Sequence, residues 1–379
     1  MRIGLITGEY PPMRGGVGDF TALLAQGLQT HGHTIQVFST PPAQSQHGEA
    51  IDTTIRRWNF RSLPTVQRWA KANWLDVLNL QYQTAAYRMS PWIHVLPRWV
   101  KAAPMITTFH DLRFPYLFPK AGLLRERVVM SLAYRSAGVI TTNHEDYAKV
   151  KHLPNSTMIP IGSTIRPDLP PQYDAQAWRA KLGVPSETLL IGYFGFINHT
   201  KGVDTLLESF AALPTKQPAR LLMIGEHLGT ADPTNTGYAA QIKYQIQNYG
   251  LTDDILWTGD VSDVDVNGWL RAVDVVVMPF RDGASYRRSS LMAAIQQGCA
   301  IVTTQPTVPI STFEHGENIW LIPPQNPNAL TQAFKSLNDP ALRQRLQTGA
   351  SRLAHTFDPT ARVQATLDFY AQVRQSWQR

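Results

Sequence analysis

The feature that most constrains the fold is a repeated alternation of short apolar runs with longer helical stretches. Six such runs lie in the first half of the chain: Arg2–Thr7, Thr34–Ser39, Val77–Gln81, Met105–Phe109, Gly138–Thr142 and Ser156–Ile161. Six more follow in the second half: Leu189–Phe194, Ala219–Gly225, Ile255–Thr258, Val273–Met278, Ala300–Thr304 and Ile319–Ile322. Apolar runs of this length between helices are typical of buried parallel strands joined by helical crossovers. The chain is therefore predicted to be an α/β protein.

A proline-rich polar segment, Arg166–Gln172, interrupts the alternation and is predicted to join two domains. With 379 residues, 43% of them hydrophobic, the chain is long enough for two separate cores. We expect one Rossmann-like βαβ domain over residues 1–165 and a second over residues 166–358. Residues 359–379 carry an apolar helical face and are predicted to form a helix that packs back toward the first domain. Two such sheets in series predict a ligand cleft between their carboxyl-terminal strand edges.

The apolar segments and the cysteine content indicate the cellular compartment of the protein. None approaches the run of about 20 uncharged apolar residues that a membrane-spanning helix needs. The stretch Met1–Glu9 reaches an acid after a short apolar run, which indicates a core strand rather than a secretory signal. The single cysteine, Cys299, excludes internal disulfides and is predicted to be a packed thiol in a reducing compartment. We therefore expect a cytoplasmic protein.

The formal net charge of +7 is concentrated in residues 1–165. Basic residues there alternate with aromatic ones: Arg56, Arg57, Arg61, Arg68, Lys71, Arg88, Arg98 and Lys101 lie among Trp58, Phe60, Trp69, Trp74, Trp92 and Trp99. Such a mixture suits an anionic membrane surface or a lipid-linked acceptor, and it also suits a plain solvated basic face. Nucleic acid is the weakest of the three alternatives because no helix-turn-helix, zinc-finger or ribonucleoprotein signature accompanies the charge.

A glycine-rich loop follows the first predicted strand. Within Glu9–Asp19, Gly15, Gly16 and Gly18 let the backbone approach a ligand, and the helical stretch Phe20–Gln29 comes next. The loop matches neither the Gly-x-Gly-x-x-Gly dinucleotide fingerprint nor the Gly-Lys-Ser/Thr of a P-loop. Nicotinamide and Walker-type nucleotide binding are therefore disfavoured, and a tight turn is the simplest alternative to a ligand loop.

Five segments, one in the first half of the chain and four in register in the second, resemble the family 4 retaining glycosyltransferases, glycosyl transferases group 1, which have the two-domain GT-B fold. Glu9-Tyr10-Pro11-Pro12 with Gly15-Gly16-Val17 resembles the opening loop of that family. Gly195 to Leu207 is similar to its Gly-Arg-Leu-x-x-x-Lys-Gly-x-x-x-Leu-Leu segment. The stretch Ala272–Pro279, the turn and strand Gly298–Thr304 and the stretch Gly316–Pro324 follow in the family's order. The resemblance spans nearly the whole chain.

This resemblance implies roles for specific residues. Lys201 is expected to bind the diphosphate of a sugar nucleotide, because a point positive charge after a strand stabilises a leaving phosphate. His110, at the end of a predicted strand, is expected to help place the transferred sugar, and Gly16 with Gly15 to approach the donor. A structural histidine and a surface lysine without a ligand are the alternatives.

The sequence departs from the family at its best-known motif. Alignment on Gly298 places Ser285 and Ala293 where the family has two glutamates separated by seven residues, and Phe196 replaces the arginine of the Gly-Arg-Leu segment. Arg287 and Arg288 are new cations nearby, and we expect Arg287 in particular to replace the missing arginine, since arginine binds phosphate bidentately. Asp282 is a candidate for a sugar-hydroxyl contact, although Asp-Gly is also an ordinary turn. Ser285, Arg287 and Arg288 are likewise candidates for binding the donor.

The sequence thus predicts a glycosyltransferase that moves a sugar from a nucleotide-diphosphate sugar to an unidentified glycan or lipid-linked acceptor, with retention implied by the resemblance. No metal or other cofactor is expected, since the histidines show no ligand spacing. The loss of both glutamates keeps open a noncatalytic relative that binds a sugar nucleotide, a glycan or a partner. A peripheral position on the inner membrane face is expected if the basic-aromatic segments are an interface.

Overall fold

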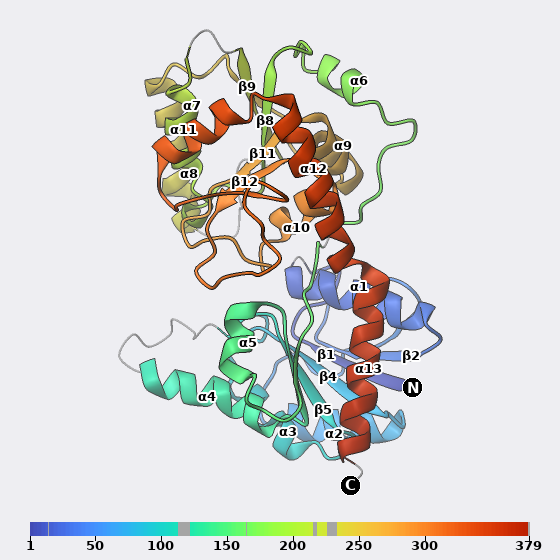
Figure 1. The fold of residues 1–379 in the computed structure, drawn as a ribbon. Coiled ribbons are helices and arrows are strands. Elements are labelled where there is room, and N and C mark those ends of the chain that lie inside the picture. Colours follow the sequence, from blue (N-terminus) through green and yellow to red (C-terminus); the bar gives the residue numbers. More distant parts are fainter. Residues whose placement is uncertain (14, 113–121, 164, 215–217, 226–232, 378–379) are drawn as a thin grey trace. The chain divides into compact units, whose positions relative to one another are not determined.

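The computed structural model describes residues 1–13, 15–112, 122–163, 165–214, 218–225 and 233–377. Its contacts divide the chain into two compact units (Figure 1). The first unit combines Met1–Thr164 with Asp358–Arg379, and the second is Ile165–Phe357. The first unit is called the N-terminal unit below, and the second the C-terminal unit.

The N-terminal unit is built on a parallel sheet with the strand order β3-β2-β1-β4-β5-β6-β7. The strands are β1 Arg2–Thr7, β2 Thr34–Phe38, β3 Ala50–Asp52, β4 Val77–Tyr82, β5 Met105–Phe109, β6 Gly138–Thr141 and β7 Ser156–Met158. The sequence order reverses between the neighbours β1 and β4, and ligands of open α/β sheets bind beyond the carboxyl ends of strands at such a reversal. The loops after β1, β4 and β5 are therefore the ones that matter for function.

Helices cover both faces of this sheet. They are α1 Gly16–Thr30, α2 Ser62–Ala72, α3 Leu96–Trp99, α4 Gly122–Arg135, α5 His144–Val150 and α13 Pro359–Trp377. On one face, Phe20 and Leu24 of α1 share a core with Ile3, Leu5 and the apolar residues of α13. The helices α1 and α13 lie side by side (Figure 1), so the end of the chain packs on its beginning. The other face packs against α2, α3 and α4.

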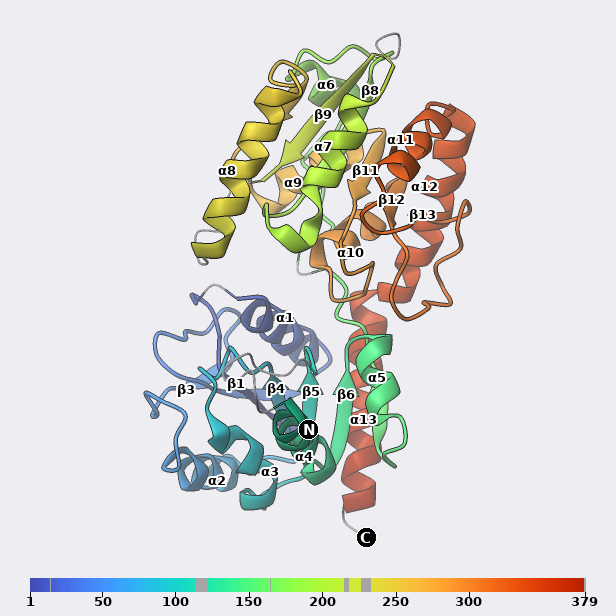
Figure 2. The ribbon, with the colours of Figure 1, turned by 90° about the vertical axis from the view of Figure 1, so that its left-hand side faces the viewer.

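The C-terminal unit has a second parallel sheet with the order β10-β9-β8-β11-β12-β13. The strands are β8 Leu189–Phe194, β9 Ala219–Ile224, β10 Ile255–Trp257, β11 Val275–Met278, β12 Ile301–Thr304 and β13 Trp320–Ile322. The helices are α6 Ala175–Ala180, α7 Val203–Ala211, α8 Pro233–Asn248, α9 Asp263–Ala272, α10 Ser289–Gln296, α11 Pro327–Ser336 and α12 Pro340–Ala354. Helices α7 and α8 lie side by side along the sheet (Figure 2). Here the reversal lies between β8 and β11.

The two parallel α/β sheets confirm the predicted fold class. The sequence predicts no strand at Ala50–Asp52, which the structure shows as the edge strand β3. Helix α1 begins at Gly16, four residues before the predicted start. Within the described ranges, no helix is both long and apolar enough to cross a membrane.

Candidate functional site

The loop after β8 is held tightly against the end of β11. Gly202 has a φ of 68°, a left-handed conformation that favours glycine, and a Cβ built there would lie 2.0 Å from the carbonyl oxygen of Pro279. Asn198 caps the 3₁₀ turn His199–Lys201, because its side chain accepts a hydrogen bond of 3.1 Å from the Thr200 N–H. The turn that carries Lys201 is therefore fixed from both ends.

Lys201 is partly buried at the carboxyl edge of the sheet, where the strand order reverses. Its Nζ atom donates a 3.2 Å hydrogen bond to Ser290 Oγ in the first turn of α10, and it lies 5.2 Å from the centre of the Phe280 ring. Burial, and to a smaller extent the Arg288 cation, lower the pKa of Lys201 to about 8, against the opposing effect of Asp282. A partly buried cation of this kind is suited to an anionic ligand, which would raise its pKa again.

Arg288 lies over the same aromatic ring as Lys201. Its guanidinium carbon is 4.7 Å from the centre of the Phe280 ring, and the group forms an ion pair with Asp282. Phe280 is 1% exposed, so two cations share one buried ring as a common support. We refer to Lys201, Phe280, Asp282, Arg288 and Ser290 as the cation cluster. Neither Phe280, in the loop after β11, nor Ser290, in the first turn of α10, was predicted from the sequence.

A second set of contacts ties the two loops of the cation cluster together. The N–H of Arg281 donates a 3.0 Å hydrogen bond to the carbonyl of Thr200, and its guanidinium pairs with Asp204 at the start of α7. Tyr238 of α8 donates a 2.8 Å hydrogen bond to the same carboxylate. The relative position of Lys201 and Arg288 is thus set by the fold and does not depend on their own side-chain contacts alone.

The other candidates of this loop have different surroundings. The Oγ of Ser285 accepts a 3.4 Å hydrogen bond from the Arg287 N–H, and the Ser285 carbonyl accepts one of 3.0 Å from the Arg288 N–H. These bonds define a turn. Ala293 is 1% exposed inside α10. Arg288 lies over the same Phe280 ring as Lys201, so Arg288 joins the predicted Arg287 as a candidate for the arginine missing at Phe196.

In the N-terminal unit, the glycine loop leads directly into α1. Gly15 adopts an extended conformation, and a Cβ built on it would lie 2.0 Å from the Glu9 carboxylate. Gly16 is the first residue of α1, and apart from its chain neighbours and the backbone of its own helix, no atom of the described residues lies within 4 Å of a Cβ built there. Burial raises the pKa of Glu9, and the charge of Asp19 adds to this effect. Gly15 thus makes room for Glu9, whereas the space beside Gly16 is open.

His110 directly follows β5 and is 7% exposed. Its Nε2 atom lies 2.9 Å from Gln81 Oε1, and its ring meets the edge of Phe20 at a centroid distance of 5.1 Å. Burial lowers the pKa of His110 to about 4, so the imidazole is neutral near pH 7. Because Phe20 lies in the second turn of α1, the structure places His110 against the helix that begins at Gly16.

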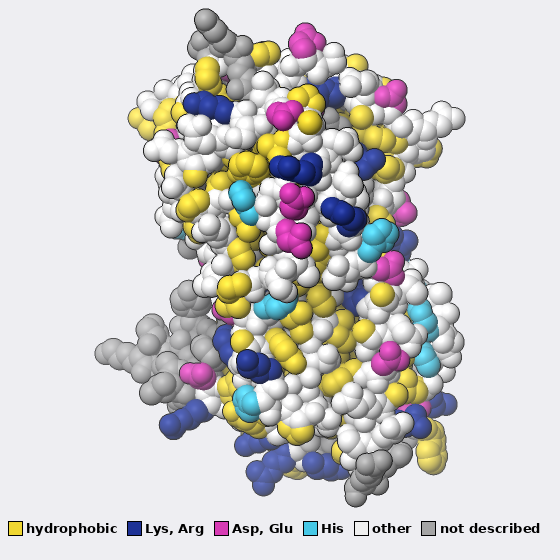
Figure 3. All heavy atoms as spheres, in the orientation of Figure 1, with side chains coloured by type: hydrophobic (Ala, Val, Ile, Leu, Met, Phe, Trp, Pro, Cys, Tyr) yellow, Lys and Arg dark blue, Asp and Glu magenta, His cyan; other side chains and the backbone are white. Residues whose placement is uncertain are grey.

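The basic-aromatic segments are only partly a surface. Trp58 and Trp69 are 8% and 5% exposed and belong to the core beneath α2, so their interpretation as interface residues is wrong. Phe60, Trp92 and Trp99 are 56%, 40% and 53% exposed. The rings of Phe60 and Trp92 contact each other edge to face at 6.0 Å. On the face shown in Figure 3, Lys and Arg side chains gather over the part of the N-terminal unit where α3 lies.

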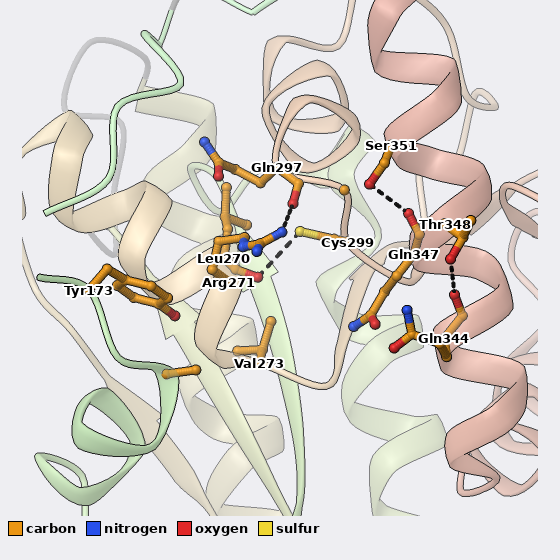
Figure 4. A pocket seen from close by; sticks show the side chains of 12 residues that line it. Tyr173, Leu270, Arg271, Val273, Gln297, Cys299, Gln344, Gln347, Thr348 and Ser351 are labelled. Atoms are coloured by element: carbon orange, nitrogen blue, oxygen red, sulfur yellow. Dashed lines mark hydrogen bonds between the residues drawn. The ribbon is translucent and has the colours of Figure 1, made fainter.

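A separate hollow of about 320 Å³ lies at the opposite, amino end of β11 and β12 (Figure 4). Arg271, Gln297 and Cys299 line one side of it, and Gln347 and neighbouring polar residues of α12 line the other. Cys299 is buried and its Sγ lies 3.3 Å from the Leu270 carbonyl, and burial raises the pKa of the thiol to about 12. The thiol is therefore unreactive, and the hollow is not part of the cation cluster. Among the residues that the structure describes, no group of three or more His, Cys, Asp or Glu is arranged to hold a metal ion.

Two parallel α/β units with polar clusters after the strands are the architecture of GT-B transferases. HepE of Anabaena, solved in complex with UDP, superposes with a TM-score of 0.78 at 18% identity, over 98% of this chain and 100% of that chain. Two family profiles match the sequence: "Glycosyl transferase 4-like domain" over residues 15–149 and "Glycosyl transferases group 1" over residues 174–352. The chain belongs to the glycosyl transferases of group 1, as its motifs predict.

The matches to curated relatives cover only part of each relative. The D-inositol 3-phosphate glycosyltransferase of Streptomyces bingchenggensis is 28% identical over 209 residues, which are 54% of this chain and 45% of that protein. The alpha-monoglucosyldiacylglycerol synthase of Streptococcus pneumoniae is 25% identical over 304 residues, which are 73% of this chain and 65% of that protein. The chain therefore spans about half to two thirds of the length of these relatives.

Proposed function

We propose that this protein transfers a sugar from a nucleotide-diphosphate sugar to an acceptor hydroxyl. The observation that carries the proposal is the cation cluster, in which Lys201 and Arg288 share the buried Phe280 ring at the reversal of the second sheet. Two adjacent cations match the charge of a diphosphate, and arginine adds bidentate geometry. That HepE was solved with UDP and with UDP-glucose agrees with such a donor.

In the proposed reaction the diphosphate leaves while the acceptor hydroxyl attacks the anomeric carbon. The new carbon–oxygen bond forms as the bond to the phosphate oxygen breaks, and the proton of the hydroxyl passes to the leaving phosphate. The resemblance to retaining glycosyltransferases implies transfer to the same face of the sugar, and Ser285 and Ala293 offer no carboxylate for a two-step route through a covalent intermediate. Lys201 and Arg288 stabilise the charge that develops on the diphosphate. Asp282 holds Arg288 until the donor competes for it.

The donor test combines a binding screen with a matched pair of lysine variants. Thermal shifts against a panel of nucleotide sugars identify the donor, because a ligand that binds only the folded protein raises its stability. With that donor, Lys201→Ala is expected to lower kcat by about 100- to 1,000-fold. Lys181→Ala removes another lysine of the same unit, which lies over the Trp178 ring at 3.8 Å, and is expected to keep full activity. Full turnover of Lys201→Ala would contradict the proposal.

For the acceptor we propose a lipid-linked alcohol presented at an anionic membrane surface on the cytoplasmic side. The support is the exposed Phe60–Trp92 pair, with the Arg61 guanidinium 5.5 Å from the Phe60 ring and further basic residues around it. The relative from Streptococcus pneumoniae is named as a lipid glycosylating enzyme, which agrees with such an acceptor.

Vesicle cosedimentation tests this surface. A Phe60→Ser, Trp92→Ser double variant is expected to lose binding to vesicles that contain anionic phospholipid, and added salt is expected to weaken binding of the unmodified protein. Trp377→Ser is the control, because Trp377 is also exposed, at 47%, but lies at the end of α13. Equal binding of the double variant and the control would remove the membrane proposal while leaving the donor proposal intact.

A further inference from the structure

Strand β4 carries two polar side chains in an entirely buried position. Asn79 and Gln81 are both 0% exposed, and the parallel register places them beside Ile106 and Thr108 of β5. Side chains two residues apart point to the same face of a strand, so Asn79, Gln81, Thr108 and His110 form one polar row on the face that α1 covers. This row ends at the carboxyl edge of the sheet, at His110.

The contact between Asn79 and the Ile106 carbonyl determines which atoms donate and which accept hydrogen bonds along this row. The carbonyl oxygen of Ile106 accepts hydrogen bonds and cannot donate them, and Asn79 approaches it at 3.2 Å. The Asn79 atom at this contact must therefore be the amide nitrogen, which also lies 2.9 Å from Thr108 Oγ1. The Oδ1 atom of Asn79 then faces Gln81 as an acceptor.

The same argument determines the hydrogen-bond directions at Gln81 and His110. Because Asn79 Oδ1 accepts, the Gln81 atom that contacts it must be the amide nitrogen Nε2. Gln81 Oε1 is left facing His110 Nε2 at 2.9 Å. An amide oxygen only accepts, so His110 Nε2 must carry the hydrogen. In a neutral imidazole the other nitrogen, Nδ1, then has a free lone pair.

We propose that Asn79 and Gln81 are positioning residues that hold His110 in its Nε2–H tautomer, so that Nδ1 is presented to the substrate as a hydrogen-bond acceptor only. The proposal rests on the proposed function in taking His110 as a substrate contact. Among the described residues, no hydrogen-bond partner is found for Nδ1. The ring is only 7% exposed, so this nitrogen has little access to solvent as a substitute partner. The neutral state of the ring agrees with this role, because burial holds its pKa at about 4.

The tautomer restricts what His110 can bind. An acceptor-only nitrogen pairs with a hydroxyl or amine hydrogen and repels phosphate and carboxylate oxygens. His110 is therefore suited to a sugar hydroxyl or the acceptor alcohol. We expect donors with a carboxylate at the position that meets His110 to be rejected in favour of those with a neutral hydroxyl.

Nitrogen-15 spectroscopy of the full chain, labelled at its histidine rings, tests the proposal without reference to activity. The resonances of His110 are assigned by their loss in His110→Gln. The expected result is one signal pattern of the Nε2–H form that does not titrate between pH 5.5 and 8. A ring protonated at Nδ1, or a mixture of both forms, would overturn the proposal, whether or not a sugar donor has been found.

Substitutions of Gln81 provide the kinetic test once the donor is known. Gln81→Glu keeps the shape but places a carboxylate against Nε2, so the pKa of His110 is expected to rise and an acid limb to appear in the pH profile of kcat. Gln81→Leu is expected to lower kcat at least tenfold with little change in the donor KM. Gln36→Leu, a half-buried glutamine of β2 in the same sheet, is the control and is expected to leave both constants unchanged. An unaltered pH profile in Gln81→Glu would also count against the proposal.

Discussion

The Nζ atom of Lys201 lies 3.2 Å from the Oγ of Ser290, a residue 89 positions further along the chain. This contact joins the loop after β8 to the first turn of α10, which lies beyond the adjacent strand β11. It fixes a cation in a partly buried position above the Phe280 ring. The arrangement favours binding of an anionic ligand. Without a ligand, the partly buried charge of Lys201 lowers the stability of the folded protein.

Replacing Lys201 by methionine is expected to stabilise the protein while removing donor binding. The pKa of Lys201 is about 8 in the folded chain and 10.5 without burial, so burial of its charge opposes folding at pH 7. We expect Lys201→Met to raise the free energy of unfolding at pH 7 by about 1–3 kcal/mol. Urea titration measures this change.

The stabilisation by Lys201→Met is expected to depend on pH within a defined window. Between about pH 8 and 10.5 the unfolded chain binds more protons at Lys201 than the folded chain, so the unmodified protein gains stability as the pH rises. The advantage of Lys201→Met should therefore shrink across this window. A constant difference between pH 7 and 10.5 would show that charge burial is not its cause. Lys181→Met, at an exposed lysine, is expected to change stability by less than about 0.5 kcal/mol at either pH.

Donor affinity is expected to fall as the pH rises through about 8, because only protonated Lys201 attracts the diphosphate. The bound anion favours the charged lysine, so the pKa of Lys201 should be higher in the complex. The decline should therefore begin near pH 8 in kcat/KM and at higher pH in kcat. Initial rates over pH 6.5 to 10 at limiting and saturating donor measure the two profiles. Their coincidence would contradict a role of Lys201 in binding the donor.

Gly202 is expected to tolerate no side chain. Gly202→Ala forces a Cβ into a φ of 68° and to within 2.0 Å of the Pro279 carbonyl oxygen, and backbone cannot move aside cheaply. Gly250 has a φ of 67° with nothing within 4 Å of its Cβ position, so Gly250→Ala carries the conformational cost alone. We expect about 1 kcal/mol of destabilisation for Gly250→Ala and at least twice that for Gly202→Ala. Denaturant titration compares them, and equal losses would mean that the loop after β8 is not packed on β11.

The sequence predicts the sheets well because their strands are nearly continuous apolar runs. Strand β3 has no such run, since Ala50–Asp52 is a short, partly exposed edge segment. The error at Trp58 and Trp69 has a different origin. Composition indicated an interface, but the helical spacing of Leu63, Val66 and Trp69 along α2 already marks a buried stripe.

The contacts in the cation cluster and around His110 could be predicted from the sequence less completely than the sheets. The position of Lys201 in the sequence motif is enough to predict it as a site residue. Its contacts with Phe280 and Ser290 depend on how the loop after β8 packs against the segment that follows β11. The position of Arg288 over this ring depends on the turn at Ser285, which no local pattern specifies. Asn79 and Gln81 did give a signal, because two amides at alternate positions of an apolar strand are unusual.

Gly15 and Gly16 are adjacent but are expected to respond oppositely to alanine. In Gly15→Ala the new Cβ meets the end of the Glu9 side chain at 2.0 Å, and because this flexible side chain can move aside, stability should fall by no more than about 1 kcal/mol. The double variant Glu9→Ala, Gly15→Ala should recover most of that loss, because the obstructing side chain is gone. In Gly16→Ala the Cβ enters open space at the start of α1, and alanine favours helix, so stability should stay unchanged or rise slightly.

The activity of Gly16→Ala then isolates the proposed ligand contact. If the substrate approaches the backbone at Gly16, the added methyl group occupies its place, and kcat/KM should fall at least tenfold in a fully folded protein. Unfolding curves and initial rates on the same preparation make the comparison. Undiminished turnover in Gly16→Ala would mean that the open space beside this glycine is solvent, and that the loop after β1 acts only by placing Glu9 and the start of α1.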